Sequence, residues 1–158
     1  DINLLLLIKM NKPFILTKIA FMKKHLYMIM AILILSCNNK GDFIQNVYVY
    51  ESIPLNLPEY SEVLTPGNTI FVDGGVEGII VYHGFGNDFK VYDRNCSYEP
   101  SLECSRIDTV DSGIAYCGCC NSAFLISNTG EAINAPALLP LKTYNWSLDN
   151  NNVLRIFN

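Results

Sequence analysis

The stretch Cys-Gly-Cys-Cys-Asn-Ser-Ala-Phe at residues 117–124 is the part of this sequence around which the rest is organised. It holds three of the six cysteines in the 158-residue chain. The upstream stretch Cys-Ser-Tyr at residues 96–98 holds a fourth, and Cys104 is the fifth. Five cysteines in 25 consecutive positions, 96–120, indicate a metal site, a disulfide framework, or both.

Beyond residue 42 the sequence predicts short β-strands separated by tight turns. No stretch there keeps a helical period for long, whereas runs rich in Val, Ile, Tyr and Phe recur between turn residues. We expect strands at 43–50, 69–72, 76–82, 89–92, 123–126, 132–133, 141–148 and 153–157, with one helical turn within 59–64. Asp73-Gly74-Gly75 is typical of a hairpin turn. The pattern predicts a single all-β domain without internal repeats.

The first 36 residues differ in composition from the rest of the chain. They hold five of the 11 basic residues but only one of the 15 acidic residues. From residue 37 onward, six basic residues stand against 14 acidic ones, a net charge of −8. Such a surface repels a phosphate backbone and gains nothing from counterion release, so we expect no nucleic-acid partner.

A secretion signal is predicted within this leader. Met-Lys-Lys-His at residues 22–25 is a short basic start, and the ten residues 26–35 form an apolar run too short to cross a bilayer. The run ends in Ile-Leu-Ser-Cys at residues 34–37, which resembles the lipobox of bacterial lipoproteins. This resemblance implies cleavage before Cys37 and lipid on its thiol. An uncleaved anchor made from residues 2–35 is the alternative.

These features divide the chain into three parts. Residues 1–36 are the expected signal peptide, residues 37–42 the lipidated Cys37 with a polar tether, and residues 43–158 the folded domain. Residues 1–21 precede the basic start, and because Asp1 is not an initiator we treat them as an over-extended start or a fragment edge. Lipid on Cys37 implies the cell envelope, with the domain on a membrane surface outside the cytoplasm. A redox or envelope protein is the expected partner there.

The two cysteine stretches resemble the ligand loops of Rieske iron–sulfur domains. Residues 117–124 are similar to that family's second loop, Cys-Pro-x-His-Gly-Ser-x-Phe, and residues 92–96 to the strand leading into the first loop. Ala-Pro-Ala at residues 135–137 is similar to the proline loop that covers the cluster. The resemblance extends over residues 43–158. It implies a small antiparallel β-sandwich or barrel with two protruding cysteine loops.

The ligand positions depart from the family pattern. Tyr98 stands where the first histidine ligand is expected, and Cys120 stands at the second. The resemblance therefore implies Cys96, Tyr98, Cys117 and Cys120 as candidate metal positions. Past the leader the only histidine is His83, well before the first loop, so this domain cannot form a two-histidine Rieske centre.

Three arrangements of the five cysteines stay open. In some Rieske domains a disulfide joins the two loops, and that resemblance implies a Cys104–Cys119 bridge. A second arrangement is an all-thiolate site suited to zinc or to a ferredoxin-like 2Fe–2S centre, made from Cys96, Cys104, Cys117 and Cys120. A third is two disulfides with one spare thiol and no metal.

The resulting functional hypothesis is a lipid-anchored Rieske-like domain that keeps the fold but has degenerate cluster ligands, acting as a binding or structural module. The alternative is an electron-transfer protein with an altered, cysteine-rich 2Fe–2S cluster; zinc is the other candidate metal. We expect no enzyme, or at most an electron-transfer component of an oxidoreductase system. No Ser-His-Asp arrangement is recognisable in the sequence, and a thiol reductase built on Cys117 and Cys120 would lack its usual βαβ context.

Overall fold

Antiparallel strands make up nearly all regular structure in this computed structural model, which describes Lys23 and residues 43–158. That part of the chain contains ten strands and one 3-10 helix, and the predicted all-β fold class is confirmed. No helix among the described residues has the length and apolar character needed to span a membrane. Apart from Lys23, the expected signal peptide, Cys37 and the tether lie outside the described residues.

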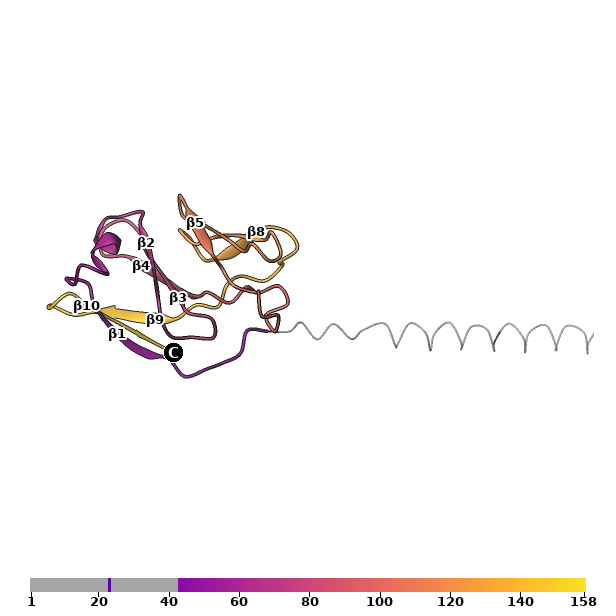
Figure 1. The fold of residues 1–158 in the computed structure, drawn as a ribbon, viewed down its shortest axis with the longest axis horizontal. Helices are drawn as coiled ribbons and strands as arrows, with labels where there is room; N and C mark the ends of the chain where they lie inside the picture. The colour runs from indigo at the N-terminus through magenta and orange to yellow at the C-terminus, as the bar shows by residue number, and fades with distance from the viewer. Residues whose placement is uncertain (1–22, 24–42) are drawn as a thin grey trace, which may run out of the picture. The chain divides into compact units, whose positions relative to one another are not determined.

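The strands form three antiparallel sheets (Figure 1). The first has the order β1-β10-β9, made from β1 (Tyr50–Pro54), β10 (Val153–Phe157) and β9 (Asn145–Leu148). The second consists of β2 (Thr69–Val72), β3 (Ile79–His83) and β4 (Phe89–Asp93), with the helix η1 (Ser61–Leu64) before β2. The third consists of β5 (Thr109–Asp111), β6 (Ile114–Tyr116), β7 (Ala123–Leu125) and β8 (Glu131–Asn134).

Strand β3 is buried on both faces and divides the interior into two cores. Because side chains alternate along a strand, Ile79 and Val81 pack into a first core with residues of β1 and β10. Ile80 and Tyr82 pack on the other face into a second core with residues of β6 and β7. The second sheet is therefore the middle layer, and the second core underlies the two cysteine loops.

Asp93 is the last residue of β4, and its fully buried carboxylate joins three segments of the chain. It accepts hydrogen bonds from the backbone N–H of Val76 and of Asn95, at 2.8 Å each. The hydroxyl of Tyr144 donates a third bond at 2.5 Å. Gly75 lies in the left-handed region at φ +65°, and a Cβ there would be 2.6 Å from the carboxylate oxygen. Glycine is required at this close approach.

The predicted hairpin around residues 73–75 joins β2 to β3, and the predicted helical turn is η1. The first strand was predicted wrongly at residues 43–50. It begins at Tyr50, which pairs with Phe157 at the end of β10. Strands β5 and β6 were missed because each has three residues, too few to show an alternating pattern.

Replacing Tyr144 with Phe should lower the free energy of unfolding by about 1–3 kcal/mol, because it leaves the buried Asp93 carboxylate without one of its donors. Burial, and then the Asp93 contact, raises the pKa of the phenol, so Tyr144 stays protonated and able to donate. Urea unfolding measures the change. The control Tyr48→Phe alters a side chain that is 85% exposed and should shift stability by less than about 0.5 kcal/mol. Equal stabilities of the two variants would contradict the structural role of this bond.

Candidate metal centre

The first cysteine loop, residues 94–108, leaves β4 directly after Asp93 and folds back on itself. The N–H of Cys96 donates to the carbonyl of Ser105 at 2.9 Å. The hydroxyl of Ser105 donates to the carbonyl of Tyr98, also at 2.9 Å. This return of the chain places Cys104, the neighbour of Ser105, beside the loop segment that carries Cys96.

The second cysteine loop, residues 117–122, is a tight turn between β6 and β7. The N–H of Asn121 donates to the carbonyl of Cys117 at 2.9 Å, and the N–H of Cys117 donates to the carbonyl of Ser122 at 3.0 Å. Asn121 has φ +58°, the left-handed conformation that asparagine tolerates better than most residues. This explains how asparagine fills the position where the Rieske pattern has glycine. Gly118 donates its N–H to the carboxylate of Asp108 at 3.1 Å.

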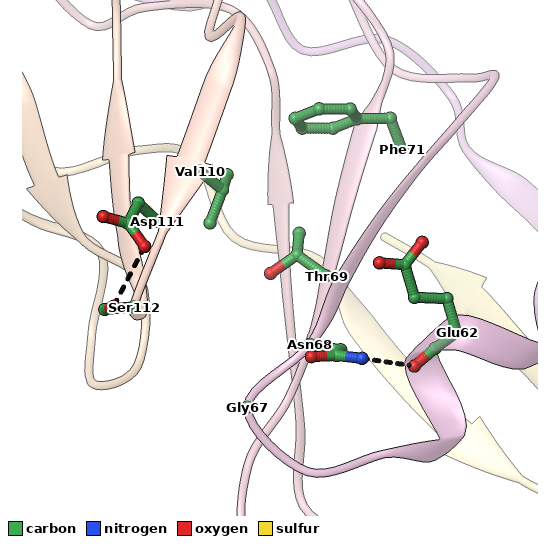
Figure 2. Close-up of a pocket in the computed structure, with 8 residues that line it drawn as sticks. All are labelled: Glu62, Gly67, Asn68, Thr69, Phe71, Val110, Asp111 and Ser112. Atoms are coloured by element: carbon green, nitrogen blue, oxygen red, sulfur yellow. Dashed lines mark hydrogen bonds between the residues drawn. The ribbon is translucent and has the colours of Figure 1, made fainter.

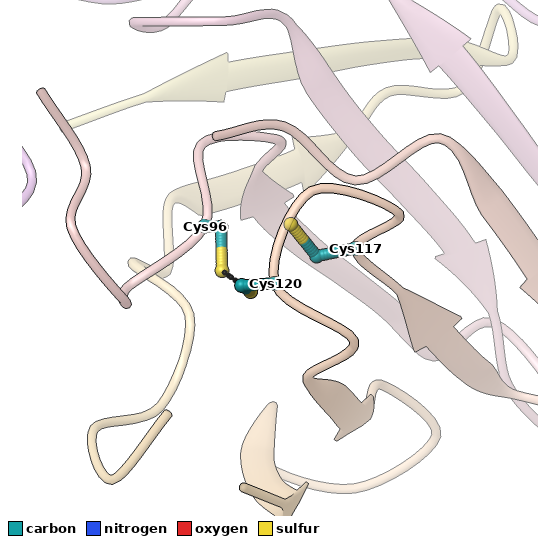
Figure 3. Close-up of side chains that lie close together, drawn as sticks. All are labelled: Cys96, Cys117 and Cys120. Atoms are coloured by element: carbon teal, nitrogen blue, oxygen red, sulfur yellow. Dashed lines mark hydrogen bonds between the residues drawn. The ribbon is translucent and has the colours of Figure 1, made fainter. Parts of the chain in front are cut away.

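The two loops bring three free thiols together (Figure 3). The Sγ atoms of Cys96, Cys117 and Cys120 all lie within 4.8 Å of one another. Those of Cys96 and Cys120 are 3.4 Å apart. Cys96 and Cys117 are 0% and 1% exposed, whereas Cys120 is half-buried at the rim. These three are the candidate metal ligands that the structure unites.

Neighbouring backbone N–H groups act to lower the pKa of each of the three thiols. The N–H of Tyr98 hydrogen-bonds to Cys96. Cys117 receives the N–H groups of Cys119 and of Cys120, and Cys120 receives that of Ser122. Such bonds favour the charged form of an acceptor and so oppose the effect of burial.

The electrostatics of these thiols would favour a bound cation. Burial raises the pKa of the Cys96 and Cys117 thiols, and the N–H donors offset only part of this effect. At Cys120, burial acts to raise the pKa, but hydrogen bonds from Ser122 and the neighbouring thiols outweigh this effect. The net result is a lowered pKa of the Cys120 thiol. Metal ligation requires thiolates. A bound cation would compensate the charge that burial otherwise suppresses.

Cys104 and Cys119 form a disulfide between the two loops, with their Cα atoms 5.6 Å apart. This is the pair implied by the Rieske resemblance. It spans a sequence separation of 15 residues, for which loop entropy gives a stabilisation of roughly 3 kcal/mol. The bridge holds the loops together without using any of the three clustered thiols.

A two-histidine iron–sulfur centre does not fit these residues. His83 is buried in β3, where its ring nitrogens contact the carbonyl oxygens of Val63 at 2.8 Å and Gly86 at 2.6 Å. It is a structural residue that ties β3 to neighbouring turns. Tyr98 packs against the second core and contributes its N–H to Cys96.

A single tetrahedral ion fits the three thiols. Zinc–sulfur bonds of about 2.3 Å place the ligand sulfurs about 3.8 Å apart, and the clustered sulfurs all lie within 4.8 Å of one another. In a 2Fe–2S centre, four ligands are divided between two irons. Three mutually adjacent thiols match one ion better than two.

The proline loop, residues 135–140, is attached to both cysteine loops. The N–H of Ala137 donates to the hydroxyl of Ser122 at 3.0 Å. The hydroxyl of Ser97 donates to the carbonyl of Leu139 at 2.6 Å. Ser122 also lies 3.1 Å from the sulfur of Cys120, a contact that the sequence prediction missed, although the serine lies within the motif that carries the resemblance. Ser122 therefore couples the thiol site to the proline loop.

A polar groove of about 270 Å³ lies between β2 and β5, away from the thiols (Figure 2). Its walls carry Glu62 and Asp111, with Thr69 between them. The hydroxyl of Ser112 donates to the Asp111 carboxylate at 3.0 Å, and the amide of Asn68 donates to the carbonyl of Glu62 at 3.1 Å. The groove is lined by neither cysteine nor histidine and is separate from the candidate metal centre.

No protein-family model matches the chain, and no curated protein sequence is similar to it. Among solved structures, the ferredoxin of carbazole 1,9a-dioxygenase from Nocardioides aromaticivorans is 16% identical, with a TM-score of 0.44 over 70% of this chain and 97% of that one. A putative NADH-dependent nitrite reductase small subunit from Mycobacterium tuberculosis is 14% identical, with a TM-score of 0.45 over 72% of this chain and 97% of that one. A ferredoxin of Sphingomonas yanoikuyae is 20% identical, with a TM-score of 0.43 over 60% of this chain and 88% of that one. Any conclusion about function must therefore be based on the residues of this chain.

Replacing Ser122 with Ala should make Cys120 a weaker acid, because it removes the hydroxyl 3.1 Å from its sulfur. Alkylation of Cys120 in metal-free protein should then slow by about fivefold near pH 8, the effect of one lost hydrogen bond, and its pH–rate profile should move to higher pH. Ser97→Ala is the matched control, because it also loosens the proline loop but touches no thiol. The same pH profile in both variants would contradict the contribution of Ser122.

Proposed function

We propose that this protein is a membrane-attached, thiolate metal-binding module built on a Rieske-like scaffold. One metal ion is bound by Cys96, Cys117 and Cys120 in place of an iron–sulfur cluster. The observation that supports this most directly is the convergence of three free sulfurs within 4.8 Å, taken from loops whose cysteines are 24 residues apart in sequence. A second support is that backbone N–H groups favour the thiolate form at each cysteine, against the effect of burial.

Zinc is the ion that best matches this donor set. Soft thiolate ligands favour Zn²⁺, Cu⁺ and iron–sulfur clusters over hard cations. Zinc takes tetrahedral sulfur sites without redox chemistry, and such sites commonly stabilise small domains. The metal would fix the two cysteine loops and, through Ser122, the attached proline loop. In this role the module presents a rigid surface to a partner.

Electron transfer through an altered 2Fe–2S centre is the second candidate function, favoured by the cysteine at a position where a Rieske domain has a histidine ligand. Cys120 would then ligate the second iron together with one further group. A centre without imidazole ligands would have a low potential and little pH dependence near neutrality, because no ligand titrates there. Its iron and sulfide content distinguishes it from a zinc site.

Attachment to the cell envelope is proposed from the sequence alone. Cys37 follows an apolar run that resembles a lipoprotein signal, and the polar residues 38–42 would separate the lipid from the domain. Two acyl chains hold a protein stably on a membrane, whereas one chain binds marginally. The partner would then be a redox or envelope protein at the same surface.

Metal analysis of anaerobically purified protein tests the proposed site. We expect one zinc per chain, no acid-labile sulfide and a colourless solution. Cys96→Ser and Cys117→Ser should each lose the metal, because each removes a buried ligand. Tyr98→Phe is the control, since it removes the phenol but keeps the N–H bonded to Cys96. About two irons and two sulfides per chain would overturn the zinc proposal and establish the electron-transfer candidate.

Membrane attachment is tested separately by replacing Cys37 with Ser. The wild-type protein should partition into the membrane fraction and the detergent phase, and the variant should lose this lipid-dependent partitioning. Metal content should be the same in both, because the three proposed ligands are Cys96, Cys117 and Cys120. Equal detergent partitioning of the two proteins would exclude a lipid at this residue.

A further inference from the structure

The three-thiol site has one coordination position to fill. Structural zinc sites are almost always four-coordinate. Among the described residues, the group of closely placed His, Cys, Asp and Glu ligand atoms at this site contains Cys96, Cys117 and Cys120 and no fourth member. The fourth position is therefore left to a donor outside this group: the Tyr98 phenol, water, a group from elsewhere, or a side chain that can be released nearby.

Cys104 borders this site from the first loop. Its neighbour Ser105 accepts the N–H of Cys96 at 2.9 Å, so the two segments run side by side. Its disulfide partner Cys119 immediately precedes Cys120 and lies two residues after Cys117. The disulfide therefore holds the sulfur of Cys104 next to the backbone that surrounds the three thiols.

The disulfide is accessible, whereas two of the three thiols are not. Both Cys104 and Cys119 are exposed, while Cys96 and Cys117 are almost fully buried. A dissolved reductant or a partner protein with a dithiol site can thus reach the bridge directly. Thiol–disulfide exchange depends on such access to the attacked sulfur.

We propose that the Cys104–Cys119 disulfide is a redox switch of the metal centre: reduction releases Cys104, which becomes the fourth thiolate ligand. A dithiol reductant supplies two electrons and two protons, cleaves the S–S bond and is itself converted to a disulfide. Cys104 then loses its proton to solvent as it binds the metal, and Cys119 stays a free thiol. This inference rests on the proposed metal-binding function and adds its regulation.

The switch changes both the number of ligands and the openness of the site. The oxidised protein has three thiolates and one exchangeable position, as in zinc sites that keep a water ligand. The reduced protein has four thiolates and a closed site. Metal affinity should therefore rise on reduction, by more than the roughly tenfold effect typical of changes around a metal's ligands.

Two single substitutions break the same disulfide but leave different thiols. Cys119→Ser frees Cys104, whereas Cys104→Ser removes it and frees Cys119. Zn²⁺ affinity is measured by competition with a chromogenic chelator, without reductant. Cys119→Ser should bind at least about tenfold more tightly than the oxidised wild type, and Cys104→Ser should not. Substituted Co²⁺ should show thiolate charge-transfer absorption about one third stronger in Cys119→Ser, because four thiolates replace three.

Reduction of the wild type with a phosphine should reproduce the Cys119→Ser result, and the same treatment should leave Cys104→Ser unchanged. These reductant measurements test the switch even if one variant folds poorly. Thermal melts of the two variants show how much stability each loses with the disulfide. Equal affinities and spectra for the two variants would overturn the switch. The metal-binding proposal would survive that result if both still bound one ion, and it would fail if neither they nor the wild type bound any.

Discussion

The buried carboxylate of Asp93 is the interaction on which the arrangement of this domain depends. A charge withdrawn from water is tolerated only when hydrogen bonds replace its hydration. Asp93 obtains them from the hairpin between β2 and β3, from the start of the first cysteine loop, and from Tyr144 just before β9. All three segments must be in place together. Cys96 follows Asn95, one of the donors, so the same requirement fixes where the first ligand loop begins.

The candidate metal centre follows from that anchoring. Once the first loop is fixed at Asp93, its return past Ser105 and the bridge from Cys104 to Cys119 bring the second loop against it. Buried thiols then meet N–H donors that suit thiolates, although burial alone disfavours the charge. A cation reconciles these two opposing effects. The metal would therefore complete a site that the fold already holds in place, instead of organising an unfolded one.

The sequence predicted the fold class and the segment that carries the chemistry, but not how the thiols are placed. Runs rich in β-branched and aromatic residues identified β3 and β4. The roles of Asp93 and Ser122 could not be predicted, because nothing local distinguishes a buried aspartate from the exposed acidic residues of the chain. The proximity of Cys96 and Cys117 could be predicted only from the Rieske resemblance, because 20 residues and the short strands β5 and β6 separate the two cysteines in sequence.

The replacement of histidine by cysteine changes what a site of this shape can do. Imidazole ligands raise the potential of an iron–sulfur centre and couple its electron to a proton. A thiol at one of these positions, Cys120, adds negative charge, favours a soft cation, and is itself open to oxidation. In the envelope compartment proposed above, which permits disulfides, oxidation and reduction of such a site would occur at its sulfurs. The proposed site, with Cys120 and an adjacent disulfide, would therefore hold a metal under thiol redox control.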